Sequence, residues 1–239
     1  STTDRQNLAR VMDEVCKKPS VSKNPALACA VLQYMAMKRG KNVGVMMPYA
    51  DSLKYMSDFY CQIWAESLGK AVDKQGNVVH AGQTPAKALG VTDQHSQVQL
   101  YTEGPFDKVI TMLAVEKFRK DVVIPSDDEI DACDFLKGHT MGELLNAERV
   151  ATEYALRKAG RMNFTVTLPE VNEETVGELL AYYMYETAFA GAYLNVDTFN
   201  QPGVEEGKKA TFAMLGRKGY EEKLAEVRAA KKKDEYFIN

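Results

Sequence analysis

The pattern of apolar and polar positions predicts helices in the first part of the chain. Apolar residues at spacings of three and four predict a first helix over residues 3–17. Asn24 suits a helix cap, Pro25 suits the first helical position, and Gly40 suits the turn that ends a helix. We therefore expect a second helix over residues 26–38.

The rest of the chain alternates between predicted strands and predicted helices. Short apolar or β-branched runs predict strands over residues 42–47, 108–113, 122–125 and 164–168. Apolar periodicity and capping residues predict helices over residues 51–69, 140–158, 172–194, 203–215 and 219–232. Residues 70–92 are expected to be loop-rich. This order favours one α/β domain, a three-layer sandwich with a mainly parallel sheet flanked by helices. In such sheets ligands bind beyond the carboxyl ends of the strands.

Composition narrows the classes of function. The chain has 239 residues and a formal net charge of -3, which gives no strong positive field for nucleic acid or an anionic membrane surface. No apolar run approaches the roughly 20 residues that span a bilayer. The four cysteines are widely spaced and are interpreted as buried, reduced thiols. We expect a cytoplasmic protein, and a chain without an initiating Met suggests a piece of something longer.

Glu66 is a candidate general base. On the predicted helix it follows Ile63 by three positions, so its carboxylate lies along the apolar face near the carboxyl end. A charge in that place is unfavourable, so the carboxylate either finds a partner or becomes more basic, as a general base requires. The alternative is a paired structural glutamate, or one that reaches solvent.

His95 is a second candidate, in the polar stretch Thr92–Gln97. Its neighbours carry several hydrogen-bonding groups that could fix the tautomer of the imidazole. A simple solvent contact is the alternative. His80 and His139 lack comparable surroundings, and the sequence gathers no His, Cys and carboxylate residues at metal-ligand spacing, so it predicts no metal site.

The densest motif is the segment 199–208, which reads Phe-Asn-Gln-Pro-Gly-Val-Glu-Glu-Gly-Lys. If Pro202 takes the first helical position, Gln201 flanks a helix amino terminus, where free backbone amides attract anions such as phosphate. Gln201, Glu205 and Lys208 would then share one helix face and could reach one polar ligand together. A surface helix with a Glu–Lys pair is the alternative.

Three segments, 64–70, 92–100 and 199–208, occur together and in one order, and this combination resembles the glucose-6-phosphate isomerase family, specifically its carboxyl-terminal half. The third segment is similar to the signature F-D-Q-x-G-V-E-x-x-K and differs only at Asn200, where the signature has Asp. The resemblance extends more loosely over residues 25–215. It implies an aldose–ketose isomerase that interconverts glucose 6-phosphate and fructose 6-phosphate through a cis-enediol, without metal or organic cofactor.

The resemblance also assigns roles residue by residue. Glu66 matches the base that moves a proton between C2 and C1, and His95 matches the histidine that assists opening of the sugar ring. Lys208 matches a lysine that shares this work, and Gln201 matches a glutamine at the phosphate end. The implied fold is a flavodoxin-like sugar isomerase domain. The implied assembly is a homodimer in which the histidine reaches the active site of the neighbouring subunit.

Two parts of the family's pattern have no counterpart in the sequence: a Ser/Thr-rich loop that cradles the phosphate and a Gly-Gly-Arg motif that steadies the enediolate. We therefore expect residues 1–239 to form a single carboxyl-terminal sugar isomerase domain with C-terminal helices. Without the amino-terminal half of the parent enzyme it should be close to inactive. The alternatives are a non-catalytic sugar-phosphate-binding module of the same fold and an isomerase for another phosphorylated sugar, such as mannose 6-phosphate.

Overall fold

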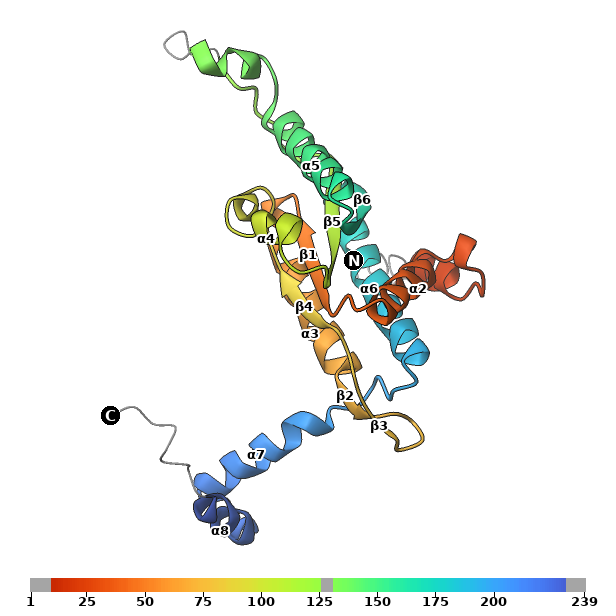
Figure 1. The fold of residues 1–239 in the computed structure, drawn as a ribbon, viewed down its shortest axis with the longest axis vertical. Helices are drawn as coiled ribbons and strands as arrows, with labels where there is room; N and C mark the ends of the chain where they lie inside the picture. The colour runs from red at the N-terminus through yellow and green to blue at the C-terminus, as the bar shows by residue number, and fades with distance from the viewer. Residues whose placement is uncertain (1–9, 126–130, 231–239) are drawn as a thin grey trace, which may run out of the picture. The chain divides into compact units, whose positions relative to one another are not determined.

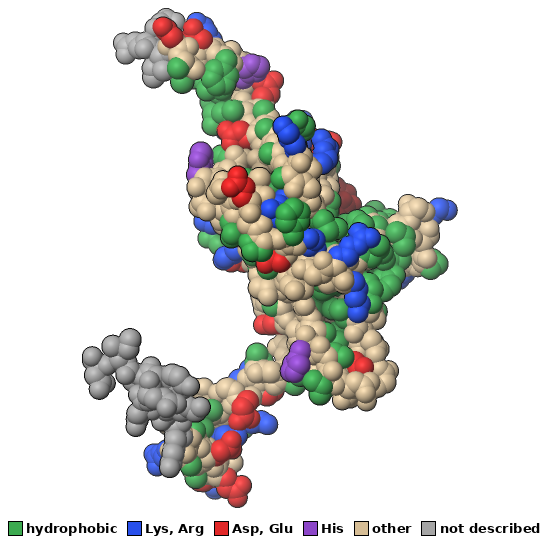
Figure 2. Space-filling view, in the orientation of Figure 1, with side chains coloured by type: hydrophobic (Ala, Val, Ile, Leu, Met, Phe, Trp, Pro, Cys, Tyr) green, Lys and Arg blue, Asp and Glu red, His purple; other side chains and the backbone are tan. Residues whose placement is uncertain are grey.

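The structure is a computed structural model that describes residues 10–125 and 131–230 (Figure 1). The chain divides into two compact units, Ser1–Thr198 (unit 1) and Phe199–Asn239 (unit 2). Acidic and basic side chains both occur on each unit, on the face shown in Figure 2, as the small net charge leads one to expect. None of the helices in the described residues is both long and apolar enough to cross a membrane.

Unit 1 is built around a parallel sheet. Among the described residues this sheet has four strands, in the order β4 (Thr84–Lys87), β1 (Val43–Pro48), β5 (Lys108–Lys117) and β6 (Met162–Glu170). Every neighbouring pair in the sheet is parallel. A separate antiparallel hairpin joins β2 (Lys70–Val72) to β3 (Val78–Ala81). The predicted α/β class with a mainly parallel sheet is confirmed.

Helices alternate with the strands of unit 1. They are α2 (Pro25–Lys38), α3 (Lys54–Leu68), α4 (Val98–Glu103), α5 (Met141–Lys158) and α6 (Glu173–Tyr193). Short 3-10 helices are η1 (Val21–Lys23), η2 (Asp51–Leu53), η3 (Thr92–Gln94) and η4 (Asp131–Leu136). Residues 10–16 are helical too, and the beginning of the predicted first helix lies outside the described residues.

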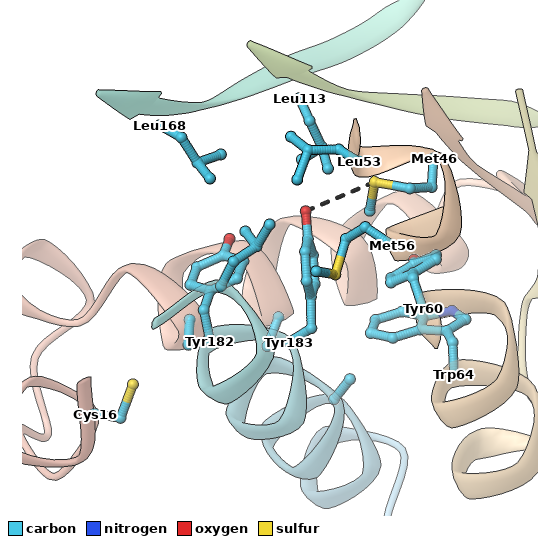
Figure 3. Close-up of a cluster of buried hydrophobic side chains, with 14 of the residues drawn as sticks. Cys16, Met46, Leu53, Met56, Tyr60, Trp64, Leu113, Leu168, Tyr182 and Tyr183 are labelled. Carbon is cyan, nitrogen blue, oxygen red and sulfur yellow. Dashed lines mark hydrogen bonds between the residues drawn. The ribbon is translucent and has the colours of Figure 1, made fainter. Parts of the chain in front are cut away.

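The sheet separates two hydrophobic cores, because successive residues of a strand face opposite sides. Met46 of β1 lies in a core with side chains from α2, α3 and α6, whereas Val45 and Met47 lie in a second core with side chains from α4 and α5. Figure 3 shows the first core, where the Tyr183 hydroxyl lies 3.7 Å from the sulfur of Met46. Helices thus cover both faces, as the three-layer prediction requires.

Local capping explains where several of these helices begin. The side chain of Asn24 accepts a hydrogen bond from the backbone N–H of Leu27 at 3.0 Å, with Pro25 following it. Thr140 and Glu143 form a reciprocal capping box at the start of α5. Each of these arrangements satisfies backbone N–H groups that the first helical turn leaves unpaired. The predictions for α2 and α5 are confirmed.

Two predictions about local structure are wrong. Residues 122–125 do not form a strand, because Val122 and Val123 are exposed and only Val123 makes an isolated bridge, to Thr140. The stretch 70–92, expected to be loop-rich, contains β2, β3 and the edge strand β4. Pro85 lies within β4, and an edge strand tolerates a proline because one side of it needs no ladder hydrogen bonds.

Two further features differ from the sequence prediction. Helix α4 had no counterpart in the predicted elements. Of the four cysteines, all free, Cys16 is buried but Cys133 is exposed, so the prediction of four buried thiols is wrong. Burial raises the pKa of Cys16 to about 11, which makes it a poor nucleophile.

The described part of unit 2 consists of α7 (Pro202–Met214) and α8 (Glu221–Ala229). Both were predicted, and the predicted end of the last helix lies outside the described residues. Phe212 and Tyr220 meet edge to face with ring centroids 5.6 Å apart, and the guanidinium of Arg217 lies 4.4 Å from the Phe212 ring centroid. Such small aromatic contacts hold a helical pair together with little buried area.

Candidate active site

Glu66 lies in the last turn of α3, and its side chain is half-buried. The helix is fixed by the apolar face predicted from the sequence, on which Met56, Tyr60, Trp64 and Leu68 are buried. The rings of Tyr60 and Trp64 stack with centroids 5.2 Å apart. The carboxylate is therefore carried by a rigid helix whose inner face is anchored in the core.

Lys70 holds the carboxyl end of α3. Its ammonium donates to the backbone carbonyl of Glu66 at 2.6 Å and to that of Ser67 at 3.0 Å, and the residue is only 7% exposed. Burial lowers the pKa of Lys70, while the charges of Asp197 and Glu66 oppose that effect. A cation at this point satisfies carbonyls that the helix end leaves unpaired and places positive charge beside the candidate base.

Gln83 ties the same end of α3 to the amino edge of the sheet. Its Oε1 accepts from the indole Nε1 of Trp64 at 3.1 Å, and its Nε2 donates to the carbonyl of Lys41 at 2.8 Å. Gly44 leaves the necessary room, since a Cβ there would lie 2.5 Å from Oε1 of Gln83. Glu66 is therefore fixed at the edge where β1 and β4 begin.

His95 follows η3, beyond the carboxyl end of β4, and it is exposed. Asp93 shapes this turn by accepting from the N–H of Leu89 and the hydroxyl of Ser96, both at 2.7 Å. Gln94 donates to the hydroxyls of Tyr49 at 2.9 Å and of Thr152 at 2.8 Å. The polar neighbours thus fix the backbone of the turn, and His95 projects outward from a firm base.

Glu66 and His95 lie at opposite edges of one sheet. Helix α3 begins after the carboxyl end of β1 and returns to the amino edge, whereas η3 follows the carboxyl end of β4. Figure 1 shows α4, which follows His95, and the β2–β3 hairpin, which follows Glu66, at opposite ends of the strands. Six residues of strand span about 20 Å. Within unit 1, the carboxylate of Glu66 and the imidazole of His95 therefore do not share one cavity.

Gln201 and Lys208 belong to unit 2. Gln201 is the residue before α7, and Pro202 takes the first helical position, as predicted. The ammonium of Lys208 donates to a carboxylate oxygen of Glu205 at 2.9 Å, and this hydrogen bond lowers the pKa of Glu205. Both side chains are more than half exposed. Glu205 and Lys208 therefore form an exposed ion pair on α7, whereas Gln201 precedes the helix with a non-helical backbone, and its place on the same face stays a prediction.

Sequence reasoning missed one buried acid, Glu186 of α6, which is 1% exposed. Burial raises its pKa to about 8. In the sequence, Glu186 follows Tyr183 by three positions and precedes Ala190 by four, so it lies on the same helix face as these two buried residues. This spacing is the sequence signal that could have indicated its burial. Among the described residues, no group of three or more His, Cys, Asp and Glu side chains is arranged to hold a metal ion.

Comparison with known proteins gives a consistent picture. A family model for phosphoglucose isomerase matches residues 6–231. A glucose-6-phosphate isomerase of Carboxydothermus hydrogenoformans is 55% identical over 231 residues, which are 96% of this chain and 50% of that protein. One of Rubrobacter xylanophilus is 44% identical over 214 residues, 89% of this chain and 47% of that protein. The chain thus spans about half the length of the curated relatives it matches.

Two crystal structures share the fold. A hypothetical protein of Thermus thermophilus aligns with a TM-score of 0.82 and 38% identity, over 89% of this chain and 50% of that one. A glucose-6-phosphate isomerase of Chlamydia trachomatis aligns with a TM-score of 0.76 and 20% identity, over 94% of this chain and 45% of that one. The second likeness concerns the fold alone.

Proposed function

Because this chain belongs to the phosphoglucose isomerase family, we propose that it is the carboxyl-terminal sugar isomerase domain of a glucose-6-phosphate isomerase. The observation that carries this proposal is the match over residues 6–231, which include all three motif segments. The substrate is then a hexose 6-phosphate, and the activity belongs to a protein about twice as long, as the relatives are. Units 1 and 2 form parts of one domain in this proposal.

Glu66 acts in this proposal as the base of the isomerisation. It removes the proton from C2 of the open-chain aldose while O1 gains a proton, which leaves a cis-enediol across C1 and C2. It then returns the proton to C1 while O2 loses its proton, which gives the ketose. A half-buried carboxylate on a rigid helix end suits this work, because the base must stay within reach of both carbons. His95 and Lys208 move the proton between O1 and O5 when the ring opens, and Gln201 binds the phosphate end.

A homodimer completes the site. Since Glu66 and His95 of one chain lie at opposite edges of the sheet, His95 of the partner subunit must supply the imidazole that works with Glu66. The exposed position of the imidazole supports this role, because an outward-facing side chain on a firm turn can reach into a neighbour. The cytoplasmic location stays a prediction.

The surface of α2 supports a contact with the amino-terminal half of the parent enzyme. From Pro25 to Met37 this helix has no charged residue, and Leu32 and Met35 are 50% and 44% exposed. A helix that is apolar on all sides is normally buried on all sides. The half of the relatives' length that this chain does not span is the occupant we assign to this face.

The test of the catalytic assignment is the substitution Glu66→Gln in the full-length protein. The amide keeps the size of the side chain but cannot accept the proton from carbon, so conversion of glucose 6-phosphate should fall by about a thousandfold or more. Glu222→Gln, an exposed acid of unit 2, is the matched control and should leave the rate unchanged. A Glu66→Gln enzyme as fast as the unmodified one would refute the role of Glu66 as the base. A full-length unmodified protein that forms no fructose 6-phosphate would instead favour a non-catalytic sugar-phosphate-binding module.

A further inference from the structure

We propose that unit 1 carries a second ligand site, for a small organic phosphate, at the carboxyl edge of its parallel sheet. A cavity of about 510 Å³ lies there, within the size range of small-molecule sites. The loops that follow β1, β4, β5 and β6 all contribute to its lining, together with the first turns of α5. Glu66 lies at the other edge, so this site is separate from the proposed base and does not depend on the isomerase assignment.

The topology of the sheet places this cavity at a switch point. From β1 the chain crosses by α3 to β4 on one side, and from β4 it crosses by α4 to β5 on the other side of β1. Helix α3, which follows β1, and helix α5, which follows β5, contribute to different cores and so lie on opposite faces of the sheet. The loops after β1 and β5 therefore diverge and leave a crevice between them, which is where open α/β sheets bind ligands.

The polar lining selects an anion. Arg119 and Lys120 are exposed at the cavity and make no hydrogen bond or ion pair with any other part of the chain that the structure describes. The hydroxyls of Ser52 and Thr92 on the facing loops are likewise without a partner in those residues. The charged residues of the lining are Arg119, Lys120 and Asp51, so the lining carries more positive than negative charge. Arginine, lysine and hydroxyl groups together are the usual donors to a phosphate.

The loop that carries the two cations is held in place. One carboxylate oxygen of Asp121 accepts from the hydroxyl of Thr140 at 2.7 Å, and the other accepts from the N–H of Gly142 at 2.8 Å. Phe118 packs on Gly142, where a Cβ would lie 2.7 Å from the ring. The cations therefore start from a backbone already fixed against α5, which reduces the entropy lost when a ligand binds.

The remainder of the lining favours a ligand that carries an apolar organic group. Apolar side chains make up most of it, among them Val91, Phe118, Leu145 and Val171. Inorganic phosphate would leave this surface exposed, whereas a phosphate monoester would cover it. Burial of apolar surface is favourable in proportion to the area removed from water, so an aryl or alkyl phosphate should bind more tightly than the free ion.

The experiment is a titration of the 239-residue chain with phenyl phosphate and with inorganic phosphate, followed by backbone amide NMR. Phenyl phosphate should shift the signals of residues 51–52, 90–92 and 118–120 and should bind more tightly than phosphate. The double variant R119Q/K120Q should weaken binding about tenfold or more, as expected for loss of charge-assisted hydrogen bonds. The matched control is R157Q/K158Q, an exposed Arg-Lys pair at the end of α5, on the amino edge, which should leave binding unchanged.

Three results would overturn the proposal. The first is the absence of saturable shifts at the cavity. The second is equal weakening by both double variants, which would show a general effect of net charge. The third is binding of phenyl phosphate no tighter than that of inorganic phosphate, which would leave an adventitious ion only. Because the altered side chains are exposed and have no partners among the described residues, circular dichroism should show all variants folded like the original chain.

Discussion

At the scale of single residues, Glu186 is a buried acid that no proposed step uses. One of its carboxylate oxygens, Oε2, has no hydrogen-bond partner among the described residues, and burial raises its pKa to about 8. Burial and the nearby charge of Glu186 also raise the pKa values of Tyr60, Tyr182 and Tyr183. The carboxyl group is therefore neutral in the folded chain up to about pH 8, whereas it ionises near pH 4.5 once unfolded.

This difference predicts that stability falls as pH rises from about 5 to 8. In that range the unfolded chain has released the proton and the folded chain still holds it, so each pH unit lowers the free energy of unfolding by up to about 1.4 kcal/mol. Glu186→Gln removes this dependence. In urea unfolding, the free energy of unfolding of the variant should therefore rise relative to that of the original chain as pH increases. Glu178→Gln, a half-buried acid two turns earlier on α6, is the control. A gap between Glu186→Gln and the original chain that stays constant with pH would contradict the explanation.

The sequence indicates the two candidate residues of unit 1 more readily than it indicates Glu186. Glu66 and His95 stand in segments with a recognisable pattern, and local periodicity places Glu66 near the end of its helix. The burial of Glu186 depends on α2 and α3 packing against α6 from far along the chain. No local pattern contains that information.

At the scale of elements, the carboxyl end of α3 is held by Lys70, whose two hydrogen bonds go to backbone carbonyls. Lys70→Met removes them and leaves two part-buried carbonyls without this donor, at a cost of about 1 kcal/mol in the free energy of unfolding. In the full-length protein the looser helix end should lower kcat about tenfold with a smaller change in KM, because Glu66 loses its position rather than its contact with substrate. Lys74→Met, an exposed lysine in the adjoining hairpin, should change neither quantity.

Normal stability of Lys70→Met in urea unfolding would contradict the packing argument. An unchanged kcat with reduced stability would show that Lys70 holds the fold and does not position Glu66. The two measurements therefore separate the structural role of the lysine from its role in the site.

The elements found from the sequence are those with local signals. Helices α2 and α5 carry their own caps and periodicity, and β5 is a long apolar run. Strand β4 has only four residues, one of them proline, and it exists because β1 offers it a partner. Residues 122–125 have strand composition but no partner strand among the described residues beyond one isolated bridge. Whether β4 and residues 122–125 form strands therefore depends on a partner strand that is distant in the sequence.

At the scale of the whole molecule, the proposed activity needs two side chains, those of Glu66 and His95, that lie far apart on the sheet of one chain. Glu66 lies at the amino edge and His95 at the carboxyl edge. In the proposed dimer each active site therefore takes its base from one chain and its imidazole from the other. The sequence suggested this sharing only through the family resemblance, whereas the strand order supports the proposal by placing Glu66 and His95 at opposite ends of the strands.

Shared sites predict complementation between two inactive variants of the full-length protein. Glu66→Gln and His95→Gln each disable both sites of their own dimers. When the two are unfolded and refolded together in equal amounts, about half of the dimers are mixed. In a mixed dimer one site combines both defects and the other is intact, so the mixture should regain about a quarter of the normal activity. Measuring fructose 6-phosphate formation before and after mixing tests this. If activity stays at the mean of the separate variants, base and histidine come from the same chain, and the argument from opposite edges of the sheet fails.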